Sequence, residues 1–103
     1  MNRIERIKEM LLESPKDDFL RHALALEYIK LDDDVSARIL FEHIITDNPA
    51  YIGSYYHLGK LYERLQLNNL AINIYEKGIE ECKKQKDQHS VNELQAALDD
   101  LLY

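Results

Sequence analysis

The sequence has very few of the residues that interrupt helices or cross-link a chain. Its 103 residues include three glycines, two prolines, one cysteine and no tryptophan. So few glycines and prolines predict long regular elements. The single cysteine, Cys82, cannot form an intrachain disulfide, and no apolar run approaches the length of a membrane-spanning helix or signal peptide. We therefore expect a cytoplasmic protein that neither spans nor binds a membrane.

The charge balance argues against a polyanionic partner. The formal net charge is −6, with acidic clusters at Asp17-Asp18, Asp32 to Asp34 and Asp99-Asp100. Nucleic acid binding draws much of its affinity from neutralising phosphates, so we expect no nucleic acid partner. The short basic stretch from Lys83 to Lys86 fits a helix C-terminus, where cations complement the helix dipole.

Apolar spacing predicts an all-α protein of about six helices. Apolar residues recur at intervals of three and four, and no segment alternates as a strand does. In the first helix this spacing places Ile4, Ile7, Met10 and Leu11 in one apolar stripe. The residue before a proline leaves the helical region, so Pro15 and Pro49 mark helix boundaries. For the last helix, Ser90 and Glu93 have the spacing of an N-terminal capping box. The expected helices are 2–13, 17–31, 35–46, 51–65, 70–83 and 88–102.

The same pattern occurs twice, 34 residues apart. A fixed period of this length is typical of stacked helical repeats, in which each unit buries its apolar face against a neighbour. The matching pairs are Leu24 and Leu58, Ala25 and Gly59, Tyr28 and Tyr62, Ala37 and Ala71, Phe41 and Tyr75, and Pro15 and Pro49.

These residues resemble the tetratricopeptide repeat family. The second copy has the pattern Tyr55-x2-Leu58-Gly59-x2-Tyr62 followed by Ala71-x3-Tyr75. The first copy has Arg21 where the family has an aromatic residue, and Lys83 stands at the second proline position. Asp32 and Gln66 stand where the family has a glycine between its helices.

The resemblance implies one domain, 1–103, of antiparallel helix-turn-helix repeats stacked as a short right-handed α-solenoid. Repeat 1 would span 18–51 and repeat 2 would span 52–85. The helix 2–13 resembles the second half of a preceding repeat. The helix 88–102 resembles the solvating cap that ends such arrays.

The resemblance also implies a protein-interaction module, or adaptor, that binds a peptide or partner helix in a concave groove. The repeat register places ten residues on that surface, although the apolar ones could instead pack under a flanking helix. They are Phe19, His22, Leu26, Ile29, Lys30, Tyr56, His57, Lys60, Glu63 and Arg64. Repeat domains that bind chaperone C-termini use Lys and Asn at defined groove positions. His22, Leu26 and His57 stand there, so we do not expect that ligand.

Neither a cofactor nor catalysis is expected. No metal-ligand spacing joins the four histidines and Cys82, and the sequence lacks a phosphate loop or nucleophile motif. Residues 32–43 are not a calcium loop, because Ala37 and His43 replace the required glycine and glutamate. We therefore expect a protein that is not an enzyme.

An alternative hypothesis is self-association, as a homodimer or in a larger array. Apolar residues gather at the C-terminus, and the first helix resembles half a repeat. Exposed apolar ends of a repeat array favour pairing. The C-terminal residues concerned are Leu98, Leu101, Leu102 and Tyr103.

Overall fold

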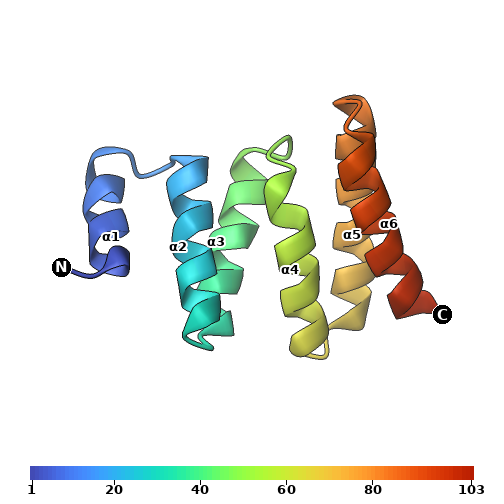
Figure 1. Ribbon diagram of the computed structural model, residues 1–103, viewed down its shortest axis with the longest axis horizontal. Coiled ribbons are helices and arrows are strands. Elements are labelled where there is room, and N and C mark those ends of the chain that lie inside the picture. The colour runs from blue at the N-terminus through green and yellow to red at the C-terminus, as the bar shows by residue number, and fades with distance from the viewer. The chain divides into compact units, whose positions relative to one another are not determined.

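The protein consists of six α-helices with no strand, which confirms the predicted all-α fold of helix-turn-helix repeats (Figure 1). The computed structural model describes residues 1–103. The helices are α1 (Arg3–Glu13), α2 (Asp18–Lys30), α3 (Asp34–Asp47), α4 (Gly53–Arg64), α5 (Asn68–Lys84) and α6 (Gln88–Leu102). None of them has the length and apolarity to cross a bilayer.

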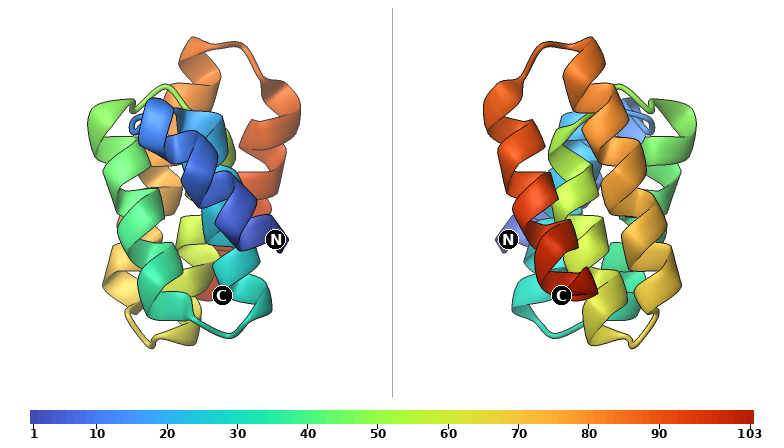
Figure 2. Two further views of the ribbon diagram at one scale, coloured as in Figure 1. Left: turned by 90° about the vertical axis from the view of Figure 1, so that its left-hand side faces the viewer. Right: turned by 90° about the vertical axis from the view of Figure 1, so that its right-hand side faces the viewer.

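The helices form two compact units, Met1–Asn48 and Pro49–Tyr103. In the first unit α2 contacts both α1 and α3, and in the second unit α5 contacts both α4 and α6. Figure 2 shows each unit from one end, with successive helices joined by short turns. Each unit therefore has a central helix that packs on a neighbour at either side.

The core of the first unit joins α1 to α2. Ile7, Ala23 and Leu24 are buried together. Partly buried side chains surround them, namely Ile4, Leu11, Leu20, Tyr28 and Leu40. Met10, which the spacing placed in the same apolar stripe, is 49% exposed. That prediction was wrong, because α2 covers only the face of α1 that carries Ile4, Ile7 and Leu11.

Two glycines allow close helix packing in the second unit. A Cβ atom at Gly59 in α4 would overlap Cε1 in the Tyr75 ring of α5. A Cβ atom at Gly78 in α5 would lie 2.8 Å from Cβ of Tyr55 and 2.9 Å from Cδ1 of Leu94. The absence of side chains at these two positions leaves room for the buried rings of Tyr75 and Tyr55.

The same turn ends α2, α4 and α5. Asp32, Gln66 and Lys86 adopt φ values of 59°, 63° and 58°, in the left-handed region that favours glycine. The next residue then donates its N–H to a carbonyl five positions back, from Asp33 to Tyr28, Leu67 to Tyr62 and Asp87 to Cys82, at 2.9, 2.8 and 3.0 Å. This is the Schellman motif, which satisfies carbonyls at a helix end.

Aspartate side chains cap three of the six helices. Asp17, Asp33 and Asp87 accept hydrogen bonds from backbone N–H groups in the first turns of α2, α3 and α6. Thus α6 is capped by Asp87, not by the predicted Ser90. The N–H and the hydroxyl of Ser90 both donate to the Asp87 carboxylate, at 3.1 and 2.9 Å. The starts of α4 and α5, at Ile52 and Leu67, have no side-chain cap.

Candidate functional site

The first unit has a hollow of about 210 Å³ along α2. Four of the five groove residues predicted for repeat 1 lie in its lining, and Ile29 does not. Arg3 of α1 closes one side, so the hollow belongs to both helices. The lining residues are Arg3, Phe19, His22, Ala23, Leu26, Glu27 and Lys30.

This first hollow combines apolar side chains with a charged rim. Phe19 is 69% exposed and offers an aromatic ring at the surface of this hollow. On the rim, the carboxylate of Glu27 forms ion pairs with Arg3 at 3.4 Å and with Lys30 at 3.0 Å. Two cations share one carboxylate, so the rim carries an excess positive charge within a chain of net charge −6.

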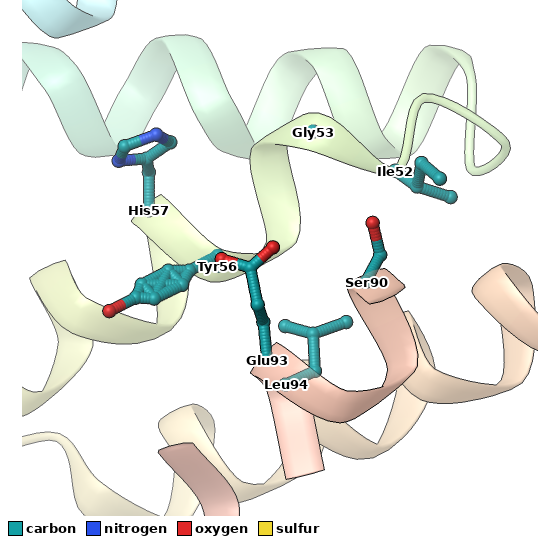
Figure 3. A pocket seen from close by; sticks show the side chains of 7 residues that line it. All are labelled: Ile52, Gly53, Tyr56, His57, Ser90, Glu93 and Leu94. Atoms are coloured by element: carbon teal, nitrogen blue, oxygen red, sulfur yellow. The ribbon is translucent and has the colours of Figure 1, made fainter. Parts of the chain in front are cut away.

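The second unit has a hollow of about 280 Å³ between α4 and α6 (Figure 3). Tyr56 and His57 are the two predicted groove residues that line it. Figure 3 shows the carboxylate of Glu93 and the hydroxyl of Ser90 reaching from α6 toward α4. The other lining residues are Ile52, Gly53 and Leu94.

Partial burial keeps the imidazole of His57 neutral at physiological pH. Desolvation lowers its pKa below the ordinary value, the charge of Arg64 lowers it further, and the charge of Glu93 acts in the opposite direction. The ring of Tyr56 lies edge-on to His57, with centroids 5.8 Å apart. The second hollow therefore offers a neutral imidazole, an aromatic ring and a carboxylate.

The other predicted groove residues of repeat 2, namely Lys60, Glu63 and Arg64, do not line this hollow. Nζ of Lys60 stands 5.6 Å from the centroid of the Tyr56 ring and 3.6 Å from the Glu63 carboxylate. That carboxylate also accepts a hydrogen bond from the Tyr75 hydroxyl, which burial and this bond keep protonated by raising its pKa. Glu63 thus supports the core of the unit, a role its groove assignment did not include.

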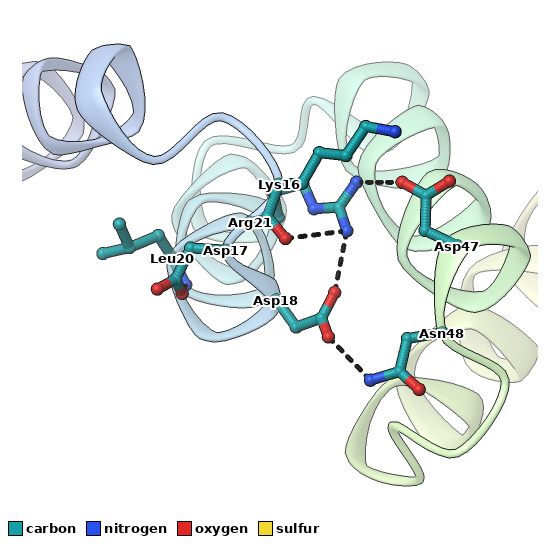
Figure 4. A network of polar contacts seen from close by, with 7 residues as sticks. All are labelled: Lys16, Asp17, Asp18, Leu20, Arg21, Asp47 and Asn48. Atoms are coloured by element: carbon teal, nitrogen blue, oxygen red, sulfur yellow. Dashed lines mark hydrogen bonds and ion pairs between the residues drawn. The ribbon is translucent and has the colours of Figure 1, made fainter.

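The Arg21 position, where the family pattern has an aromatic residue, holds an ion-pair network (Figure 4). The guanidinium is buried and donates to Asp18 and to Asp47, both at 2.7 Å. Asp18 accepts in turn from the Asn48 amide at 2.7 Å. The hydrogen bond from Arg21 lowers the pKa of Asp47. The network joins the start of α2 to the end of α3.

The structure has no cluster of metal-ligating side chains, and its single thiol is buried. No group of three or more His, Cys, Asp or Glu side chains lies together as a metal ion would require. Cys82 is buried, and burial raises the pKa of its thiol above the ordinary value. The thiol is therefore protonated at physiological pH.

Comparison with solved structures identifies the family. A tetratricopeptide repeat domain protein from Salinibacter ruber is 45% identical, and the match covers 82% of this chain and 94% of that crystal structure, with a TM-score of 0.79. The chain belongs to the tetratricopeptide repeat family.

Two further structures agree with this assignment. A solution structure of the Salinibacter ruber domain matches at 45% identity, covering 84% of this chain and 88% of that one, with a TM-score of 0.81. A Bordetella parapertussis protein shares the fold at 24% identity, covering 99% and 89% of the two chains, with a TM-score of 0.84. No protein-family profile and no curated protein matches the chain.

Within the tetratricopeptide repeat family, a helical-repeat domain is in general a protein–protein interaction module. The residues that depart from the family pattern at the glycine position and at the first aromatic position have a structural explanation in this chain. Asp32 and Gln66 adopt the left-handed conformation that the glycine would take, and Arg21 fills the aromatic position with its ion pairs.

Proposed function

We propose that this tetratricopeptide repeat domain binds a peptide or a partner helix through α2 and α4. The observation that carries the proposal is that each unit has a hollow lined by residues of its first repeat helix. Interfaces gain most of their affinity from a few aromatic or long side chains in pockets. Phe19 and Tyr56 are the aromatic side chains available for that role.

The two hollows suit different side chains of a ligand. In the first, Phe19 and Leu26 would contact an aliphatic or aromatic side chain, and Arg3 and Lys30 would stand near a polar or acidic neighbour. In the second, the hydroxyl oxygen of Ser90, whose proton is donated to Asp87, would accept a hydrogen bond, and the neutral ring of His57 would add no further charge to be buried.

The test begins with peptides selected from a random display library on the intact protein. Binding of a selected peptide is then measured by calorimetry for wild type, Phe19→Ala and Tyr56→Ala. Each variant should bind about tenfold more weakly, because loss of an aromatic contact at an interface costs more than about 1 kcal/mol. Matched controls are Val35→Ala and Tyr103→Ala, which remove exposed side chains outside both hollows.

Chemical-shift mapping with the same peptide locates its contacts. The proposal requires the largest shifts on the hollow-facing residues of α2 and α4. If the shifts instead centre on the exposed sides of α3 and α5, or if Tyr103→Ala weakens binding as much as Tyr56→Ala, the hollows are not the binding site.

Self-association through the C-terminal helix has weaker support. Leu98 is buried within the second unit and Leu101 is half-buried. Only Leu102 and Tyr103 remain prominently exposed among the four residues that suggested it. The exposed positions of α6 are otherwise mostly polar, as expected of a helix that ends a repeat array.

A further inference from the structure

The outward face of α1 has a depression that is separate from both hollows. Arg6, Glu9, Met10 and Glu13 line a depression of about 330 Å³ on this helix. Met10 is its apolar residue, half-exposed, and none of the three charged side chains forms an ion pair. In the left-hand view of Figure 2, α1 lies in front with no other helix of its unit covering it.

The repeat register shows that this face corresponds to a covered one elsewhere in the chain. Met10 precedes Ile44 of α3 by 34 residues, and Ile44 precedes Gly78 of α5 by 34. Ile44 is fully buried. Gly78 lies against Tyr55 of α4 and Leu94 of α6, so a helix packs over that position on each side. In α1 the corresponding residue, Met10, is 49% exposed.

We propose that a second copy of this chain packs on this face, with α1 antiparallel to α1 of the partner subunit. The two-fold axis would pass between Glu9 and Met10. Antiparallel pairing then places Arg6 opposite Glu13 of the partner subunit, and Glu13 opposite Arg6 of the partner subunit. Met10 would pack beside the axis against Met10 of the partner subunit. This is an isologous interface, in which one patch is complementary to itself.

The charges favour a second copy over an unrelated helix. Arg6 and Glu13 are seven residues apart, which places them on one face of α1 about 10 Å from each other along the axis. Reversing the helix exchanges their positions, so both ionic contacts form at once. Glu9 is the exception, because it would approach Glu9 of the partner subunit near the axis and oppose association.

The expected dimer is weak. An 11-residue helix offers a contact about 16 Å long. Its buried area falls below the roughly 1,200 Å² of stable interfaces. The proposal does not depend on peptide binding, because the outward face of α1 is separate from the side chains of Phe19 and Tyr56.

The experiment is sedimentation equilibrium of the full chain from micromolar to millimolar concentration. Wild type should pass from monomer to dimer. Arg6→Glu and Glu13→Arg should each dimerise about tenfold more weakly, because each places like charges opposite one another at two symmetric sites. An equimolar mixture of these two variants should dimerise as wild type does, because the two acidic side chains of one copy then face the two basic side chains of the other. Glu9→Gln should strengthen the dimer.

Controls on α5 separate a local effect from one of net charge. Lys77→Glu and Glu80→Arg make the same charge changes at exposed residues and should leave dimerisation unchanged. Circular dichroism verifies that each variant is folded. A wild-type chain that stays monomeric to millimolar concentration overturns the proposal. So does a dimer that Arg6→Glu and Glu13→Arg do not weaken, or a mixture that fails to recover.

Discussion

The two repeats bury the same helix position with opposite chemistry. In the first repeat, Arg21 is buried, and its guanidinium donates hydrogen bonds to the carboxylates of Asp18 and Asp47. In the second, 34 residues later, Tyr55 is buried and donates its hydroxyl to the carbonyl of Pro49 at 2.6 Å. Both side chains therefore satisfy polar groups near a helix end. In both repeats this position therefore holds a large buried side chain with a hydrogen-bond donor at its tip.

The two repeats also differ in how the starts of their helices are capped. Asp17 and Asp33 cap α2 and α3, whereas α4 and α5 start without a side-chain cap. The second repeat instead has the close pair Gly59 and Tyr75, where the first has Ala25 and Phe41. Charge and capping contribute more in the first repeat, and close helix packing contributes more in the second. Substitutions in each repeat test this contrast.

Arg21→Met should have the largest effect, a loss of about 2 kcal/mol, because it removes a buried cation and leaves the partly buried carboxylate of Asp18 without its partner. The difference in unfolding free energy between wild type and Arg21→Met should become smaller in acid. The pKa of Asp47 is lowered from its ordinary value of 3.8 by the hydrogen bond from Arg21, so its contribution to stability is present above pH 4 and lost as pH falls. Urea unfolding of wild type and variant at several pH values measures this.

Tyr55→Met is the matched control for Arg21→Met. It should also lose about 2 kcal/mol through poorer packing, but its deficit should shrink in alkali instead. Burial raises the pKa of Tyr55 from 10.0 to about 12, so its contribution is complete below pH 10 and is lost as pH rises toward 12. If the stability losses of Arg21→Met and Tyr55→Met became smaller in acid by the same amount, the ion-pair role of Arg21 would be contradicted.

Gly59→Ala should cost about 1–2 kcal/mol despite the higher helix propensity of alanine. The added methyl group would enter the Tyr75 ring, which the bond to Glu63 holds in place. Tyr75→Phe removes that bond and reproduces the Phe41 side chain of the first repeat. We therefore expect the double variant to be more stable than the sum of the two single losses predicts, which chemical denaturation of all four proteins measures. Strict additivity would show that the ring does not adjust.

Leu67→Asp should have the smallest effect, a gain of a few tenths to about 1 kcal/mol. Leu67 has φ −101° and ψ 60°, close to the −95° and 72° of Asp33, so an aspartate there can cap α5 as Asp33 caps α3. Part of the gain is offset because Leu67 is half-buried. Hydrogen exchange of the first turn of α5 should slow. The control is Leu67→Asn, which caps without a charge.

The sequence predicted the six helices because their signals are local. Pro15 and Pro49 mark helix boundaries and Asp32 to Asp34 mark a turn, all within a few residues of the feature they specify. The errors have local causes as well. Ser90 fits a capping box, yet Asp87 lies at the residue that follows the left-handed turn and takes the role. Met10 fits an apolar stripe, but α2 is too narrow to cover it.

The predicted groove residues depend on contacts that spacing does not reveal. Phe19, His22, Leu26 and Lys30 share one hollow, and Tyr56 and His57 share another. In contrast, Glu63 holds the hydroxyl of Tyr75, which is 12 positions away, and Arg21 binds Asp47, which is 26 positions away. Neither partner can be read from helix periodicity. Both require the turn geometry that brings the helices together.

The turn that ends α2, α4 and α5 also has a consequence for how this chain folds. Each turn closes with hydrogen bonds between residues at most five positions apart, and each joins two helices that contact one another directly. Closing so short a loop costs little entropy, and contacts between sequence neighbours favour rapid folding. Every hairpin can therefore form as soon as its second helix has left the ribosome, before the rest of the chain has been synthesised.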